Sequence, residues 1–203
     1  MSRFRFQVLE VRDSAPQEWL RVWAGLYPSA DDPEYHDLVA RYKSLSAEDF
    51  ERIGKWKDSA TTEAQWQPNV ASVAYLIWKR AAKELPGCPE PNQVADFLDR
   101  WSGETYNDKF SNKRVVKHFG LSRATALLHF LSGGRYPIFD ARVRTAIARL
   151  CNCAVQNTIP WYLDSFCPIF RELARLCETE NDLRRLDKAL FSYGGYKKLP
   201  FSN

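Results

Sequence analysis

The sequence predicts an all-α protein. Apolar residues recur at helical spacing in almost every segment, and Ser, Thr, Asp or Pro opens most of those segments. Only Phe4-x-Phe6-x-Val8 alternates as a β-strand does, so we expect at most a short extended segment there. With 203 residues, 45% of them hydrophobic, the chain can bury a core as one large domain or as two small lobes.

The signals that start and stop helices follow one another along the chain. Pro16 follows a candidate N-cap, Ser14, and Ser46 with Asp49 resembles a capping box. Thr179 starts a stretch that caps the last helix, and a glycine pair ends that helix. The other expected helices are one opened by Pro68, one that follows Pro91, and those over 111–119, 123–132, 141–151 and 161–177.

The longest apolar runs are far shorter than the ~20 residues that span a bilayer. The first residues, Met1-Ser-Arg-Phe-Arg-Phe-Gln7, lack the apolar stretch of a secretory signal. We therefore expect a soluble cytoplasmic protein without a membrane partner.

The cysteines favour reduced thiols over a disulfide framework, because five is an odd number and no secretion signal accompanies them. They contain no Cys-x2-Cys pair, and Cys167 and Cys177 fall on apolar positions of an expected helix. The three histidines, His36, His118 and His129, have no metal-ligand spacing. We expect no metal site and no cofactor.

The charge is distributed unevenly. Between Lys109 and Leu150 the single acid is Asp140, and the net charge of that stretch is +8, whereas the whole chain carries +4. Such a block is typical of a surface that binds a polyanion, although a solvated charged surface is the alternative. The basic residues of this stretch are Lys109, Lys113, Arg114, Lys117, Arg123, Arg135, Arg142, Arg144 and Arg149.

Residues 115–150 place a phosphate-binding pattern next to that single acid. A basic helix is expected to end near Phe119, and after the turn 120–122, Ser122 is expected to cap the next helix. Backbone N–H groups at the start of a helix bind phosphate, and Lys117 and Arg123 flank them here. One helix later, Asp140 opens another helix.

At these residues the sequence resembles the helix-hairpin-helix DNA glycosylase superfamily, which includes endonuclease III and the adenine and 8-oxoguanine glycosylases, in a divergent bacterial-type branch. The family hairpin, roughly Leu-Pro-Gly-Val-Gly-Arg-Lys-Thr-Ala, is similar to His-Phe-Gly-Leu-Ser-Arg-Ala-Thr-Ala at 118–126. The family's catalytic aspartate lies in a Val-Asp-Thr-His-Val-type motif, which looks like Ile138-Phe-Asp140-Ala-Arg-Val143. The resemblance is good over about 40 residues and only architectural elsewhere.

The resemblance implies a two-lobed helical fold over 1–203 with an active-site cleft between the lobes. One lobe, about 105–155, would hold the hairpin and Asp140, and 1–104 with 156–203 would form the other. It also implies a monomer that acts on double-stranded DNA in the nucleoid, with Asp140 as the catalytic residue. The implied DNA-binding residues are Lys117, His118, Gly120, Leu121, Ser122, Arg123 and Arg142.

Three positions depart from the family pattern. His118 replaces the proline of the hairpin and Ser122 its second glycine, which leaves the backbone amides but alters the turn. Ala124 stands where the lyase lysine would be, and a Schiff base needs an amine there. The iron–sulfur cysteines of some members are missing. The chain therefore looks monofunctional, able to release a base but not to cut the strand by that route.

A single carboxylate suits this chemistry. Breaking an N-glycosidic bond develops positive charge on the sugar, which an ionised Asp140 would stabilise while it positions or deprotonates the attacking water. A helix N-terminus and Arg142 both favour the anion. The alternative is that Asp140 merely caps the helix over 141–151.

A glycosylase must also extrude its base, fill the gap and stack the base in a pocket. Lys57 follows a short amphipathic segment and could contact a phosphate or the target base, although a surface lysine is the ordinary interpretation. For each aromatic candidate, packing in the core is the more common interpretation. The candidates for the pocket or the wedge are Trp56, Lys57, Trp66, Tyr106 and Phe139.

The sequence thus predicts a monofunctional DNA glycosylase for a damaged or modified base, in repair or in the restriction of foreign DNA. The alternative is a non-catalytic helix-hairpin-helix module that binds DNA phosphates, and RNA binding is a weaker third possibility. Which base is released is not determined, because the least family-like regions, 50–80 and 155–203, would shape the pocket.

Overall fold

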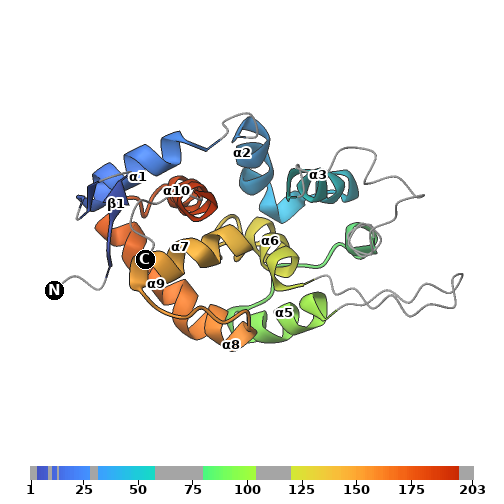
Figure 1. The fold of residues 1–203 in the computed structure, drawn as a ribbon. Coiled ribbons are helices and arrows are strands. Elements are labelled where there is room, and N and C mark those ends of the chain that lie inside the picture. The colour runs from blue at the N-terminus through green and yellow to red at the C-terminus, as the bar shows by residue number, and fades with distance from the viewer. Residues whose placement is uncertain are drawn as a thin grey trace, which may run out of the picture. The chain divides into compact units, whose positions relative to one another are not determined.

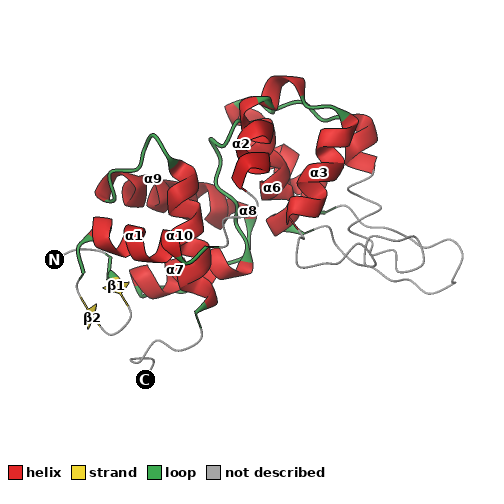
Figure 2. Ribbon diagram, turned by 90° about the horizontal axis from the view of Figure 1, so that it is seen from above, coloured by secondary structure: helices red, strands yellow, loops and turns green. Residues whose placement is uncertain are grey.

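The computed structural model describes residues 4–8, 11–12, 14–27, 32–57, 80–103 and 120–196. Most of these residues are helical, and their only strands form one short hairpin, which confirms the all-α prediction (Figure 2). No helix in these ranges combines the length and the apolar character needed to cross a membrane. The expected helices at Pro68 and over 111–119 lie outside the described residues.

The elements follow the order that the helix signals predict, with one helix over 32–40 that no signal predicted (Figure 1). They are β1 (Gln7–Val8), β2 (Val11–Arg12), α1 (Pro16–Gly25), α2 (Asp32–Ala40), the 3-10 turn η2 (Tyr42–Ser44), α3 (Ala47–Lys57), the 3-10 turn η5 (Pro91–Gln93), α5 (Val94–Ser102), α6 (Leu121–Leu131), α7 (Ala141–Cys151), α8 (Ile159–Trp161), the π-helical turn η6 (Tyr162–Phe166), α9 (Cys167–Leu176) and α10 (Leu183–Gly195).

The chain divides into two compact units. The first unit is Met1–Ser29 with Pro137–Asn203, and the second is Ala30–Tyr136. This division differs from the expected lobes of 105–155 and the remainder, because α6 packs on α3 and α5 whereas α7 packs on α10. The helix expected after the hairpin, α6, and the helix that Asp140 begins, α7, were expected in one lobe but belong to different units.

The first unit is built around α10, which packs against α1 and α7 (Figure 1). The expected alternation at the N-terminus is confirmed, since Phe4, Phe6 and Val8 are all buried. The Phe6 ring lies 5.7 Å from that of Trp19, and the Arg5 N–H donates to the Leu150 carbonyl (2.8 Å). This segment therefore closes one side of the helical core.

Close contact between α7 and α10 depends on one glycine. A Cβ atom placed on Gly194 would lie 1.8 Å from the carbonyl oxygen of Arg142 and 3.1 Å from the backbone nitrogen of Ala146. Only a residue without a side chain fits between the two backbones at this point.

The expected helix over 161–177 is nearly continuous, as α8, η6 and α9, but contains a π-helical turn. Pro168 lies in the first turn of α9 and has no N–H to donate. The Cys167 N–H donates to the carbonyl of Tyr162, five residues back, which is the π-helical pairing. The proline thus locates the change of register.

In the second unit, α6 is buried along most of its length. Trp56 of α3 packs edge-on against Phe130 of α6, with ring centroids 5.1 Å apart. The ring of Tyr35, from α2, lies 5.6 Å from that of Phe130. These three rings form the aromatic centre of the unit.

The structure confirms three expected helix starts and corrects two. Ser46 and Asp49 form the capping box, and Asp140 caps α7. Ser14 does not cap α1, whose N-cap is Ala15. The stretch expected to cap the last helix does so through its final residue, Asp182, whose side chain accepts from the Arg185 N–H. Gly120 rather than Ser122 is the N-cap of α6.

The buried thiols are predicted to resist alkylation. Burial raises the pKa of Cys167 to about 11 and that of Cys177 to about 12, whereas Cys88 and Cys153 are exposed. Because the thiolate is the nucleophile, iodoacetamide at pH 8 should modify Cys88 and Cys153 first, and Cys167 and Cys177 only after unfolding in urea. Peptide mass spectrometry over time measures the order, and equal rates for Cys153 and Cys167 in the native protein would contradict the packing.

Candidate functional site around Asp140

Asp140 lies at the N-terminus of α7, with its side chain partly exposed. Its backbone is extended, with φ −92° and ψ 176°, and Oδ1 accepts a hydrogen bond from the Val143 N–H at 2.9 Å. The capping interpretation of Asp140 is therefore confirmed. A cap does not exclude chemistry, because this carboxylate also reaches solvent.

The segment before Asp140 is anchored in the core. The Phe139 side chain is 0% exposed, and its ring centroid lies 5.6 Å from Trp161 and 4.7 Å from Phe166. The hydroxyl of Tyr162 donates to the Pro137 carbonyl at 2.9 Å. A ring without exposed surface offers no face on which a base can stack, so Phe139 serves as the anchor of Asp140 rather than as a pocket residue.

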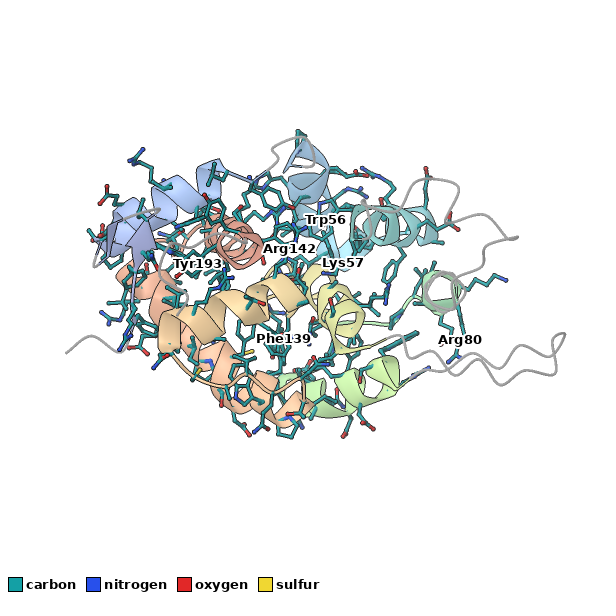
Figure 3. All side chains as sticks on the ribbon, viewed as in Figure 1. Trp56, Lys57, Arg80, Phe139, Arg142 and Tyr193 are labelled. Atoms are coloured by element: carbon teal, nitrogen blue, oxygen red, sulfur yellow. The ribbon has the colours of Figure 1, made fainter. Side chains whose placement is uncertain are left out.

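The arginines of α7 have partners within the first unit. Arg142, labelled in Figure 3, has an exposed side chain. Its guanidinium lies 4.3 Å from the ring centroid of Phe191. Arg144 contacts Asn157 and lies over the Phe139 ring. These contacts orient two positive groups within the first turn after Asp140.

Arg149 has a structural role. Its Nη1 donates to the carbonyls of Tyr193 (2.8 Å) and Tyr196 (3.0 Å), at the C-terminus of α10. A cation at this end of a helix is favourable because the last carbonyls lack partners within the helix. Part of the basic block therefore stabilises the fold rather than forming an open surface.

The described part of the expected hairpin begins at Gly120. Gly120 has φ 82°, a left-handed value that favours glycine, and its N–H donates to the Ser102 carbonyl at 3.2 Å. Leu121 is buried, whereas Ser122 and Arg123 are half-buried in the first turn of α6. Lys117 and His118 lie outside the described residues.

Of the expected pocket or wedge residues, Trp56 and Lys57 are described at the end of α3 (Figure 3). Trp56 is 9% exposed and belongs to the aromatic centre of the second unit, while Lys57 is partly exposed. Trp66 and Tyr106 lie outside the described residues. Only Lys57 of the described pair presents a substantial surface to a ligand.

A buried polar cluster around His129 was not predicted from the sequence. The Nδ1 of His129 lies 2.7 Å from the carbonyl oxygen of Tyr136, and its Nε2 lies 2.7 Å from the hydroxyl of Tyr35. A carbonyl only accepts, so Nδ1 carries the proton, and in the neutral ring Nε2 accepts from Tyr35. Two residues 94 positions apart form this contact, and the only local signal was a histidine within an apolar helix.

A second polar cluster surrounds Asp49. The two Nη atoms of Arg41 donate to its carboxylate at 2.8 and 2.9 Å, and the Ser46 N–H donates at 2.9 Å. The hydrogen bonds from Arg41 hold the pKa of Asp49 well below its usual range, against the opposing effect of burial. The cluster joins α3 to the end of α2.

Acid should weaken this cluster. Because the folded-state pKa of Asp49 is depressed, its stabilisation is complete above the unfolded value of about 4 and is lost as the pH falls below that value. Asp49→Asn should cost about 2 kcal/mol at pH 7, and the difference from wild type should shrink by pH 3. Urea unfolding at both pH values measures it. Asp37→Asn, which removes an exposed partner of Arg41, is the control with a smaller effect, and a pH-independent difference for Asp49→Asn would contradict the prediction.

Across the described ranges, no three His, Cys, Asp or Glu side chains are grouped as a metal site requires. No protein-family model matches the chain, no curated protein is significantly similar to it, and no solved structure matches it. The functional interpretation therefore depends on the residues themselves.

Proposed function

We propose that this protein is a monofunctional DNA glycosylase that hydrolyses the bond between sugar and base of a damaged or modified nucleotide, with Asp140 as the catalytic carboxylate. The observation that carries the proposal is the position of Asp140. It is the only acid in residues 109–150, whose net charge is +8. It lies at a helix N-terminus, and its side chain remains partly exposed.

The local geometry supports this role in two ways. The buried ring of Phe139 and the hydrogen bond to Val143 hold the carboxylate on a rigid element, as a preorganised charge requires. Arg142 and Arg144 follow in the first turn of α7, where their positive charges would attract the phosphates of a DNA strand. The carboxylate would stabilise the positive sugar and orient the water, and neither task needs it to give up its cap.

The proposal excludes lyase chemistry through a Schiff base at the position of the family lysine. Ala124 occupies that position in α6 and is 0% exposed. Without an amine there, the expected product is an abasic site in an unbroken strand. The proposal includes the helix-hairpin-helix glycosylase fold and the hairpin residues Gly120, Leu121, Ser122 and Arg123 as DNA contacts.

The test is direct. Labelled duplexes that contain uracil, alkylated, oxidised or hypermodified bases are incubated with the protein, and abasic sites are then cleaved with alkali. Strand breaks that appear only after alkali support the proposal. The released base is identified by mass spectrometry, with genomic and phage DNA as further substrates. Comparing the bases released from the two kinds of DNA distinguishes a role in repair from a role in the restriction of foreign DNA. An absence of breaks on every substrate would contradict the proposal.

One observation favours a second candidate, a DNA-binding module without catalysis. The bond from the Val143 N–H to Asp140 already gives that carboxylate a structural purpose. Such a module would bind duplex DNA with an affinity that falls steeply with salt, at a slope near −0.9 per neutralised phosphate, and would release no base. Fluorescence anisotropy at several salt concentrations, together with the product assay, separates the two candidates.

A further inference from the structure

The second unit contains a cavity that the proposed function does not use. Its volume is about 590 Å³, within the ~300–1,000 Å³ typical of small-molecule sites. All of its lining residues belong to the second unit and lie within the described ranges, and Asp140 is not among them. The lining comes from η2 and the start of α3, from residues 85–91, and from the end of α6 with the turn that follows.

The cavity combines aromatic and apolar walls with two cations. Tyr42 and Tyr136 contribute half-buried rings, and the nearly buried Phe50 and Leu131 contribute apolar surface. Aromatic side chains of this kind stack on flat rings of a ligand.

Lys43 and Arg135 bring positive charge to the same walls, and both side chains are exposed. Within the described ranges neither forms an ion pair with a carboxylate. Glu90 is the one acid among the lining residues, and its carboxylate accepts from the backbone N–H of Gln93 in the capping box of η5. With two cations against one acid, the lining is net positive and favours an anion.

The cations and rings are held in place by the surrounding backbone. The Nε of Arg135 donates to the Ser132 carbonyl at 2.9 Å, which orients the guanidinium and leaves Nη1 to bind a ligand. A Cβ on Gly133, whose φ is +63°, would lie 2.9 Å from Cδ1 of Tyr42, so the glycine admits the tyrosine ring. The facing segment 85–91 contains three prolines, which reduce the entropy lost on binding.

We propose that this cavity binds a small aromatic anion of the size of a nucleoside monophosphate. The flat ring would lie against Tyr42 and Tyr136, and the phosphate would be bound by Lys43 and Arg135. The inference does not depend on the glycosylase function, since it concerns other residues and a free ligand.

Calorimetric titration with AMP and with dTMP tests the proposal on the full chain. We expect binding that weakens about tenfold in Lys43→Gln and in Arg135→Gln, the loss of one charge-assisted contact each. Lys83→Gln is the matched control, because Lys83 is exposed in the same unit but does not line the cavity, and it should bind as wild type does. Equal weakening in all three variants, or no binding at millimolar nucleotide, would overturn the proposal.

Two further arms distinguish the ligand chemistry. Inorganic phosphate should bind at least tenfold more weakly than AMP, since it lacks the ring, and equal affinity would overturn the aromatic part of the assignment. A single-stranded oligonucleotide that binds where neither mononucleotide does would overturn the assignment to a free small molecule.

The location can be tested without a variant. Cys88 lines the cavity, with its Sγ 3.9 Å from Nη2 of Arg135, whereas Cys153 is an exposed thiol of the first unit. Saturating AMP should slow the alkylation of Cys88 by iodoacetamide at least fivefold and leave Cys153 unchanged. Equal rates for Cys88 with and without bound AMP would place the nucleotide elsewhere and overturn the proposal.

Discussion

Asp140→Asn should lower the rate of base release by at least about 10²-fold, the loss typical of removing one preorganised charged or polar group from a transition state. Asparagine is as good an N-cap as aspartate, so the bond from the Val143 N–H persists and the stability should change by less than about 0.5 kcal/mol. Single-turnover assays on the best substrate, together with urea unfolding, measure both quantities on one preparation.

Two variants complete that experiment. Asp140→Ala removes cap and carboxylate together and should also destabilise the protein by about 1 kcal/mol. Asp182→Asn makes the same change at the N-cap of α10, where the carboxylate accepts from the Arg185 N–H at 3.2 Å, and should leave activity intact. Undiminished base release by Asp140→Asn would remove Asp140 from the mechanism and leave it only a helix cap.

Gly194→Ala should destabilise the first unit by about 3 kcal/mol or more, the upper range for an overpacked core. The added methyl group would lie 1.8 Å from a backbone oxygen of α7, so the two helices must separate to admit it. Because α10 packs on both α1 and α7, that separation weakens the centre of the unit. Thermal and urea unfolding of the variant measure the loss.

Gly25→Ala is the matched control for this prediction. Gly25 is the last residue of α1, in the same unit, and a Cβ there meets no atom within 4 Å. Alanine should therefore be neutral or stabilise by up to about 1 kcal/mol, through its better helix propensity. Similar stability changes in the two variants would mean that the close contact between α7 and α10 is absent.

The sequence predicted the local elements well because their determinants lie within one turn of each other. The helix expected over 141–151 is present as α7, and the capping box at Ser46 depends on a contact three residues away. The error of two residues at α6, Ser122 for Gly120, arose because Gly120 begins the helix through its left-handed backbone (φ 82°) and makes no side-chain cap bond.

The candidate site was less predictable than the fold. Asp140 was recognisable from its charge context and its place before a helix, and its capping role followed from the same signal. Phe139 was a candidate for the base pocket, with core packing as the more common interpretation, and it lies in the core. The sequence alone does not decide between the two, since an aromatic residue before a helix gives no sign of which side it faces. Arg149 was counted with the polyanion-binding block but donates to the end of α10, 44 residues away.

The amino-acid sequence by itself determined that this protein is helical, that its N-terminal segment alternates between core and solvent, and that one acid lies among many bases. The periodicity and charge that carry this information repeat over a few residues. Only the tertiary structure decided that α7 packs on α10 while α6 packs on α3 and α5, that Tyr35 meets His129, and that Lys43 and Arg135 line one cavity. Such pairings join residues distant along the chain, and they are selected by the shape and burial of whole helices rather than by any local pattern.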